Sequence, residues 1–268
     1  MMSTSDATHG SDKMTVRSVE RALDILSAFI GHEKHLSLTD IATKVQLHKS
    51  TVHRLLNSLE DRGFVEKIPD LERYRLGNKI IELSSYASRS SDLIQTSIAE
   101  MRKLRDDLGE TVSLYIRDRY ERIRLHAVES NQVVRRIAII GQRLPLHAGA
   151  ASKILIAYLS APEREKLFSD PDCPPELKTT VYQQTLAEIQ QRGYATSFGE
   201  RETGVAAISA PIFYENGSLA AALSLSGPLD RFPQTILEQH AKKVMSSANH
   251  ISNLLVYNQI NHYDTNIR

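Results

Sequence analysis

The chain has 268 residues, enough for about two domains of ordinary size. Hydrophobic residues make up 41% of it and charged residues 24%, which excludes a collagen-like, disordered or coiled-coil chain as a whole. The 33 Lys and Arg and the 32 Asp and Glu leave a formal net charge of +1, so any nucleic-acid-binding surface must be local.

Cysteine and histidine usage argues against metal and disulfide chemistry. Cys173 is the single cysteine, so neither an intramolecular disulfide nor a cysteine-based zinc site is expected. The ten histidines show no metal-binding spacing, and we predict no metal and no cofactor. No apolar run approaches the roughly 18 residues that span a bilayer, which favours a cytoplasmic protein with no membrane contact. Residues 1–13 are polar and are predicted to form a disordered tail.

The first ordered residues predict three helices and a hairpin. The first helix has Ser18 as its N-cap and ends at Gly31, with one buried face. That face contains Val19, Ala22, Leu23, Leu26 and Phe29 or Ile30. The second helix starts at Ser37, which has capping-box spacing to Asp40, and buries Ile41, Ala42 and Val45. The third spans 49–62 and buries Val52, Leu55, Leu56 and Leu59, with Gly63 after its end. Alternating residues at 64–68 and 73–76 predict a strand, a turn and a return strand. This order is typical of a winged helix-turn-helix DNA-binding domain, which we assign to residues 14–78.

Two helices at 77–89 and 92–108 are expected next, joined by a polar break at 88–91. We assign a linker helix to 79–91 and an effector-binding and oligomerisation domain to 92–260. The second helix has an apolar stripe made of Ile94, Ile98, Met101, Leu104 and Leu108. We expect this stripe to join copies of the chain, although it could instead pack on its own domain.

The rest of the chain predicts mixed α and β structure. Strands are expected at 111–116, 123–128 and 133–140, followed by a helix at 150–159. A capping box at Thr185 predicts another helix, which Gly193 ends. Asn216-Gly217 predicts a hairpin between strands 205–214 and 219–226, and a last helix covers about 235–258. This pattern favours an α+β sensor domain.

The third helix is the candidate DNA reader. Residues 41–59 contain no Asp or Glu, and an acid-free basic window suits a surface that meets phosphates. Helical spacing turns Lys49, Ser50, His53, Arg54 and Asn57 outward. The predicted DNA-binding residues are Arg17, Arg21, Lys44, Lys49, Ser50, Thr51, His53, Arg54, Asn57 and Arg73. The alternative is an ordinary solvated face on a small helical domain.

Several segments resemble the IclR family of bacterial transcription regulators. They include Arg17-Ser18-Val19-Glu20-Arg21-Ala22-Leu23-Asp24-Ile25-Leu26, Lys49-Ser50-Thr51-Val52-His53-Arg54-Leu55-Leu56 and Leu144-Pro145-Leu146-His147-Ala148-Gly149-Ala150-Ala151-Ser152-Lys153. The resemblance covers about residues 16–258 in matching order. It implies a GAF-like antiparallel-sheet effector domain that binds small, often acidic, metabolites. From the apolar stripe and the helix-turn-helix we predict a homodimer or homotetramer on double-stranded DNA, because two-fold pairing of such units matches a pseudo-palindromic operator.

The effector site that the resemblance implies consists of Ala150, Ala151, Ser197, Ala207, Ser224 and Ser226. Ser224 and Ser226 are two apart on a strand and face the same way, and a helix start near Ala150 offers free N–H groups to a small carboxylate. The alternative is a solvated strand face. Some family members have a Gly-Ala pair where this chain has Ala150-Ala151, and some have an acidic residue near Ser197 and a cysteine where this chain has Ala207. A different effector from their two- and three-carbon oxoacids is therefore expected.

Other polar residues have simpler explanations. The loop Glu200-Arg201-Glu202 is expected to be solvated, with a pocket lid as the alternative. His147 is a structural hydrogen-bonder or a pocket residue, and nothing near Cys173 in sequence suggests a base.

The sequence therefore predicts a ligand-responsive transcription regulator, a repressor of a catabolic operon that senses a small carboxylate. The alternative is a small-molecule-binding enzyme domain fused to a helical module. Because the chain has no nucleophile motif, phosphate loop or zinc motif, we predict no enzyme activity and no catalytic residues.

Overall fold

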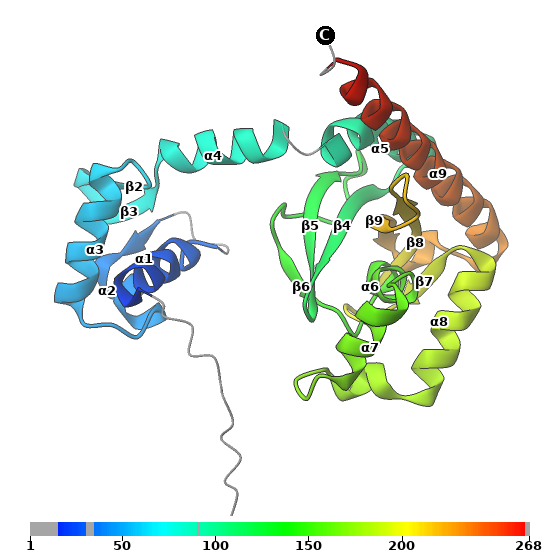
Figure 1. Cartoon of the computed structure of the whole chain (residues 1–268), viewed down its shortest axis with the longest axis horizontal. Helices are drawn as coiled ribbons and strands as arrows, with labels where there is room; N and C mark the ends of the chain where they lie inside the picture. The colour runs from blue at the N-terminus through cyan, green and yellow to red at the C-terminus, as the bar shows by residue number, and fades with distance from the viewer. Residues whose placement is uncertain (1–15, 31–34, 90–91, 266–268) are drawn as a thin grey trace, which may run out of the picture. The chain divides into compact units, whose positions relative to one another are not determined.

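The computed structural model describes residues 16–30, 35–89 and 92–265, and the predicted tail lies outside them. The chain divides into two compact units, Met1–Ala87 and Ser88–Arg268. Figure 1 shows the helices and strands of both units. No helix in the described ranges combines the length and apolar character needed to cross a membrane.

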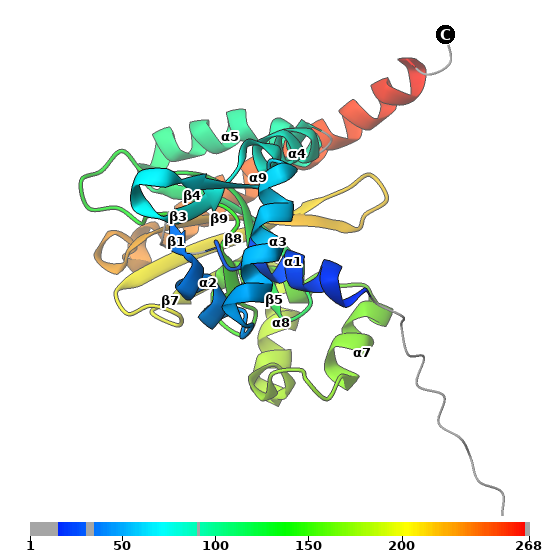
Figure 2. The same cartoon turned by 90° about the vertical axis from the view of Figure 1, so that its left-hand side faces the viewer.

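The N-terminal unit is a winged helix-turn-helix, as predicted. Helices α1 (Arg17–Ser27), α2 (Leu38–Lys44) and α3 (Lys49–Asp61) pack together, with α3 against both α1 and α2 (Figure 2). Strands β1 (Leu36–Ser37), β2 (Val65–Ile68) and β3 (Arg73–Leu76) form an antiparallel sheet in the order β1-β3-β2. Ile25, Ile41, Val52, Leu56 and Tyr74 fill the core. Helix α4 (Asn78–Arg89) follows β3.

Local signals explain two of these helices. The Ser37 hydroxyl accepts the Asp40 N–H at 3.1 Å, and the Asp40 carboxylate accepts the Ser37 N–H at 2.9 Å. This capping box satisfies donors that the first turn of α2 leaves free. Gly63 follows α3 with a φ of +75°, which suits a residue without a side chain.

The first helix differs from its prediction in two ways. Val16, not Ser18, is at the N-cap position, and no side chain caps the helix. Val19 and Leu23 are more than half exposed, while Ile25 is fully buried. Phe29 is buried and Leu26 packs against the core, as predicted, so periodicity identified part of the buried face and included exposed residues beside it. Gly31, the predicted stop, lies outside the described residues.

The C-terminal unit is built on one antiparallel sheet. Helix α5 (Asp92–Leu108) leads into β4 (Thr111–Asp118), β5 (Glu121–Val128) and β6 (Arg143–Pro145). Helices α6 (Ala150–Ala157), α7 (Ala161–Ser169) and α8 (Thr180–Arg192) precede β7 (Ala195–Phe198). Strands β8 (Val205–Phe213) and β9 (Leu219–Pro228) form the predicted hairpin, and α9 (Gln234–Thr265) follows. The sheet order is β6-β5-β4-β9-β8-β7, and the mixed α+β class is confirmed.

Both faces of this sheet carry an apolar core, and one of them also carries a cluster of small polar residues. Val112, Ile208, Leu223 and Leu225 point to one face and pack beneath α5 and α9 (Figure 1). Residues at the alternate positions point to the other face, which α6 covers. Tyr115, Ala195 and Ala222 pack with α6 there in a second apolar core. Beside them, cross-strand pairing aligns small residues in two rows: Ser197, Ala207, Ser226 and Thr111 in one, and Ser209, Ser224 and Ser113 in the next. The alternation therefore places a polar surface opposite α6.

The apolar stripe on α5 packs within its own unit. Met101 and Leu104 are buried in the core formed with α9 and the sheet, and Ile94 and Leu108 pack against it. Ile98 is half-buried. The stripe therefore gives no support to the expected contact between chains, because its side chains already have partners in the same unit.

Two further predictions were wrong. Residues 133–140 form an irregular loop and not a strand. Side chains, rather than a neighbouring strand, bind the backbone of this loop. Arg231 donates to the Val134 carbonyl and Thr111 to the Arg136 carbonyl, both at 3.0 Å. Thr185 does not cap a helix. Helix α8 begins earlier, after Thr179, whose hydroxyl accepts the Tyr182 N–H, and it ends at Gly193 as predicted.

Candidate functional site

The outward face of α3 is free to meet DNA. Lys49, Ser50, His53, Arg54 and Asn57 are exposed, and Thr51 is half-buried. Among the described residues, neither Lys49 nor Arg54 makes an ion pair, so both cations are available to an external partner. Val52 and Leu56 anchor the opposite face in the core, with Leu55 and Leu59 packed beside them, as predicted.

The other predicted DNA contacts surround α3 on different elements. Arg17 on α1, Lys44 at the end of α2 and Arg73 on β3 are exposed, and Arg21 on α1 is half-buried. In the wing, which is the hairpin of β2 and β3, two cations are paired with carboxylates of the same hairpin. Lys67 pairs with Glu72 at 2.7 Å and Arg75 with Glu66 at 2.9 Å. Among the described residues, the predicted DNA-binding cations on α1, α2, α3 and β3 make no ion pair, so their charge is available to an external partner.

A pocket lies between the polar sheet face and the start of α6. It contains about 430 Å³ of empty space, open solvent at its mouth included. All six predicted effector residues line it: Ala150, Ala151, Ser197, Ala207, Ser224 and Ser226. The remaining lining residues are Tyr115, Arg122, Arg136, Gly149, Arg201, Glu202 and Val205. The structure thus brings together residues from segments about 75 positions apart in the chain.

Buried hydroxyls beside the pocket lack partners within the protein. Ser113 on β4 and Ser209 on β8 flank Ser224 in the cross-strand row. Both are at least 99% buried, and neither hydroxyl has a hydrogen-bond partner among the described residues. Since buried polar groups are normally satisfied, this row has unused capacity for a polar ligand or for water.

Two arginines are buried beneath the pocket without a carboxylate partner among the described residues. Arg122 is 4% exposed and donates from Nη1 to the carbonyls of Pro145 and Ala148 and to the Ser152 hydroxyl. Its Nε is buried without a partner, and burial lowers the pKa of this guanidinium. Arg124 is 1% exposed and donates to the Tyr115 hydroxyl at 2.7 and 2.9 Å. Uncompensated buried positive charge favours an anion in the adjoining cavity.

The start of α6 is partly occupied by the chain itself. The Gly149 N–H donates to Glu200 Oε2 at 3.1 Å, and Lys153 pairs with the same carboxylate. The N–H groups of the following residues, Ala150 and Ala151, belong to the first turn, which has no intrahelical acceptor for them. Glu200 therefore closes one side of the helix start while the pocket side stays open.

Sequence reasoning missed the arginines of the pocket. Arg122 and Arg124 alternate with Ile123 and Leu125 on β5, and this pattern signals two cations on one face of the strand. Arg136 carried no such signal, because it lies in the loop that was predicted to be a strand. The alternative of a charged lid has partial support, since Arg201 and Glu202 line the pocket.

Two residues weighed in the sequence do not belong to the pocket. His147 is exposed and does not line it. Cys173 is buried, and burial raises the pKa of its thiol, which makes it a poor nucleophile.

Comparison with known proteins agrees with both units. A model of the IclR helix-turn-helix domain matches residues 18–69, and one of the bacterial transcriptional regulator IclR C-terminal domain matches residues 85–253. The regulator XynR of Escherichia coli K12 is 31% identical over 90% of this chain and 98% of its own length. The transcriptional repressor IclR of the same organism is 28% identical over 88% of this chain and 89% of its own.

A solved structure extends the likeness to the whole fold. An IclR homolog from Microbacterium hydrocarbonoxydans, crystallised with 4-hydroxybenzoate, superposes with a TM-score of 0.77 at 25% identity. The match covers 89% of this chain and 98% of that one. With the winged helix-turn-helix, the sheet pocket and both domain models in agreement, the chain belongs to the IclR family of helix-turn-helix transcription regulators.

Proposed function

We propose that this regulator is a repressor of a catabolic operon and that a small carboxylate metabolite controls its binding to DNA. The exposed residues of α3 read the operator, with Lys49, His53 and Arg54 in the major groove and Lys44 on the phosphate backbone. We further propose that it acts in the cytoplasm, where the operator is.

The observation that carries the effector class is the charge of the pocket. Arg122, Arg136 and Arg201 line it together with a single carboxylate, Glu202. Adjacent hydroxyls of Ser224 and Ser226 and the start of α6 add neutral donors that favour an anion. The related protein from Microbacterium hydrocarbonoxydans was crystallised with 4-hydroxybenzoate, a small organic acid, and this supports a small organic acid as the class of effector here.

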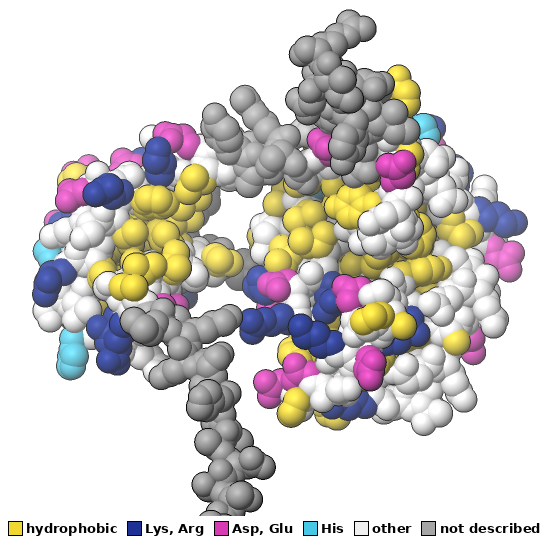
Figure 3. All heavy atoms as spheres, viewed as in Figure 1, with side chains coloured by type: hydrophobic (Ala, Val, Ile, Leu, Met, Phe, Trp, Pro, Cys, Tyr) yellow, Lys and Arg dark blue, Asp and Glu magenta, His cyan; other side chains and the backbone are white. Residues whose placement is uncertain are grey.

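We also propose a homodimer or homotetramer that binds a pseudo-palindromic operator. With the α5 stripe buried, support comes from α1 and its N-cap, where Val16, Val19 and Leu23 are more than half exposed. Hydrophobic side chains gather over this side of the N-terminal unit (Figure 3). An exposed apolar helix face of this kind marks an interaction surface.

A gel-shift titration with the DNA upstream of the gene tests the function. We expect a specific shift that excess unrelated DNA does not compete away and that a carboxylate metabolite weakens. An enzyme domain fused to a helical module would instead show no preference for this DNA. No feature of the described residues favours that second function.

A further inference from the structure

The pocket wall carries more positive than negative charge. Arg122, Arg136 and Arg201 face one lining carboxylate, Glu202. Arg122 Nη1 donates to neutral oxygens and makes no ion pair with Glu202. Glu202 instead pairs with the other two arginines. Its Oε2 lies 2.9 Å from Arg136 Nη1 and 2.9 Å from Arg201 Nη2.

The two sides of this ion pair differ in burial. The Arg136 side chain is 13% exposed, whereas that of Glu202 is 54% exposed. Moving Glu202 into water therefore costs little, while Arg136 left without an anion would keep a largely buried charge. The carboxylate is the replaceable partner and the guanidinium is the fixed one.

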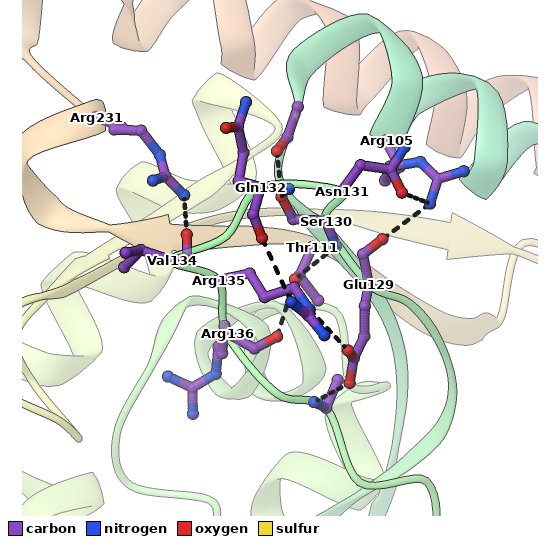
Figure 4. Close-up of polar contacts among 12 residues, drawn as sticks. Arg105, Thr111, Glu129, Ser130, Asn131, Gln132, Val134, Arg135, Arg136 and Arg231 are labelled. Carbon is purple, nitrogen blue, oxygen red and sulfur yellow. Dashed lines mark hydrogen bonds and ion pairs between the residues drawn. The ribbon is translucent and has the colours of Figure 1, made fainter.

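Arg136 is fixed by the backbone of its own loop (Figure 4). Thr111 Oγ1 donates to the Arg136 carbonyl and Arg231 Nη2 to the Val134 carbonyl, each at 3.0 Å. Two residues further on, the Ala138 N–H donates to the Glu129 carboxylate at 3.0 Å. These contacts hold the backbone on both sides of Arg136, and its side chain is largely buried, so the cation has little freedom to leave the pocket wall.

The segment that carries Glu202 is held at its two ends, where the Gly199 N–H donates to the Val205 carbonyl and the Leu229 N–H to the Gly204 carbonyl, both at 2.8 Å. It is flanked by Gly199 and Gly204, which have φ values of +68° and +79°. A Cβ on either glycine would meet no atom within 4 Å, so open space surrounds both. Because the Glu202 side chain is itself half exposed, it can leave Arg136 by rotating into solvent without moving the backbone of the segment or the packed sheet.

From this arrangement we infer that Glu202 is a built-in counter-anion of the pocket, which the effector carboxylate displaces from Arg136. The inference rests on the proposed carboxylate function. In the empty pocket the Arg136–Glu202 pair ties the 129–142 loop to the segment between β7 and β8. Effector binding breaks this tie, while the separate Glu200 contacts to Gly149 and Lys153 remain. Glu202 thus lowers the affinity for every monocarboxylate that the pocket accepts.

Isothermal titration of wild type and Glu202→Gln with pyruvate, succinate, benzoate and 4-hydroxybenzoate tests this inference. Removing the competing charge should tighten binding of an accepted acid roughly three- to tenfold. The matched control is Glu215→Gln in the turn at the opposite end of β8, which makes the same change in net charge and should leave affinity unchanged. Arg136→Gln should weaken binding of the same acid.

The outcomes separate the inference from the function on which it rests. Tighter binding by Glu202→Gln alone supports the inference, because a merely structural role would weaken binding. Equal or weaker binding by Glu202→Gln, with Arg136→Gln still impaired, overturns the role of Glu202 and leaves the carboxylate site standing. If none of these acids binds to wild type or to any variant, both the carboxylate function and the role of Glu202 are overturned for these acids. Binding to Glu202→Gln but not to wild type supports both.

Discussion

Gly149 illustrates how one residue sets the geometry of the pocket. It precedes α6 with a φ of +100°, and a Cβ there would lie 2.9 Å from Arg122 Nη2. Both the strained backbone and the crowding of a buried cation disfavour any side chain at this position.

Gly149→Ala should therefore lower the free energy of unfolding by more than the roughly 1 kcal/mol that backbone strain alone costs. Gly217→Ala is the matched control, since Gly217 has a φ of +75° but open space around its Cβ position. Urea denaturation of both variants measures the difference. Equal losses of unfolding free energy in the two variants would show that the Arg122 side chain moves aside without destabilising the fold.

Ser224→Ala tests the predicted hydroxyl contact to the effector. Loss of one charge-assisted hydrogen bond costs about 1.5–3 kcal/mol, roughly a tenfold to hundredfold loss of affinity for the acid. DNA binding without ligand should stay close to wild type. Calorimetric titration beside a gel shift measures both, with Ser246→Ala on the exposed side of α9 as control. Unchanged affinity would place the site elsewhere, and lost DNA binding would make Ser224 structural.

At the scale of elements, the start of α2 depends on the Ser37–Asp40 capping box. Ser37→Ala should cost about 1 kcal/mol of stability, measurable by denaturation. Hydrogen bonds from Ser37 lower the pKa of Asp40. Because the folded-state pKa lies below the unfolded one, this contribution is present above about pH 4 and is lost as the pH falls through the folded value. The gap between wild type and variant should narrow in acid, and a constant gap would contradict the capping role of Asp40.

Helix α3 and the end of α2 should affect DNA binding differently. Arg54→Ala should cost about 1–3 kcal/mol on the operator and relax specificity at one base pair. Lys44→Ala should weaken binding to all sequences alike and reduce the salt slope by about 1. Gel shifts over a salt series distinguish these effects, with Lys242→Ala in the C-terminal unit as control. Equal, sequence-independent losses would reassign Arg54 to a phosphate.

For the whole molecule, we expect an assembly of two or four chains of 30.1 kDa each. Sedimentation at micromolar protein should show it, and Leu23→Asp on α1 should shift the equilibrium toward the single chain. The control is Val181→Asp on α8, which also adds a charge at an exposed apolar site, since Val181 is 72% exposed. A wild-type protein that sediments only as single chains would contradict the proposal.

The sequence by itself determined the winged helix-turn-helix, the hairpin and most helix ends. These features depend on contacts within a few residues, such as the Ser37 cap, Gly63 after α3 and the alternation along β9. It also identified six residues that line one pocket, through two-residue periodicity and the family resemblance.

Only the tertiary structure decided which apolar faces are covered and which charges meet. The α5 stripe is buried by α9, more than 100 residues later, and 133–140 is a loop because Thr111 and Arg231 bind its backbone. Arg136 meets Glu202, which lies on a separate loop much later in the sequence. Periodicity reports the environment of one element, whereas such pairings depend on loops whose course is set by side chains from distant strands.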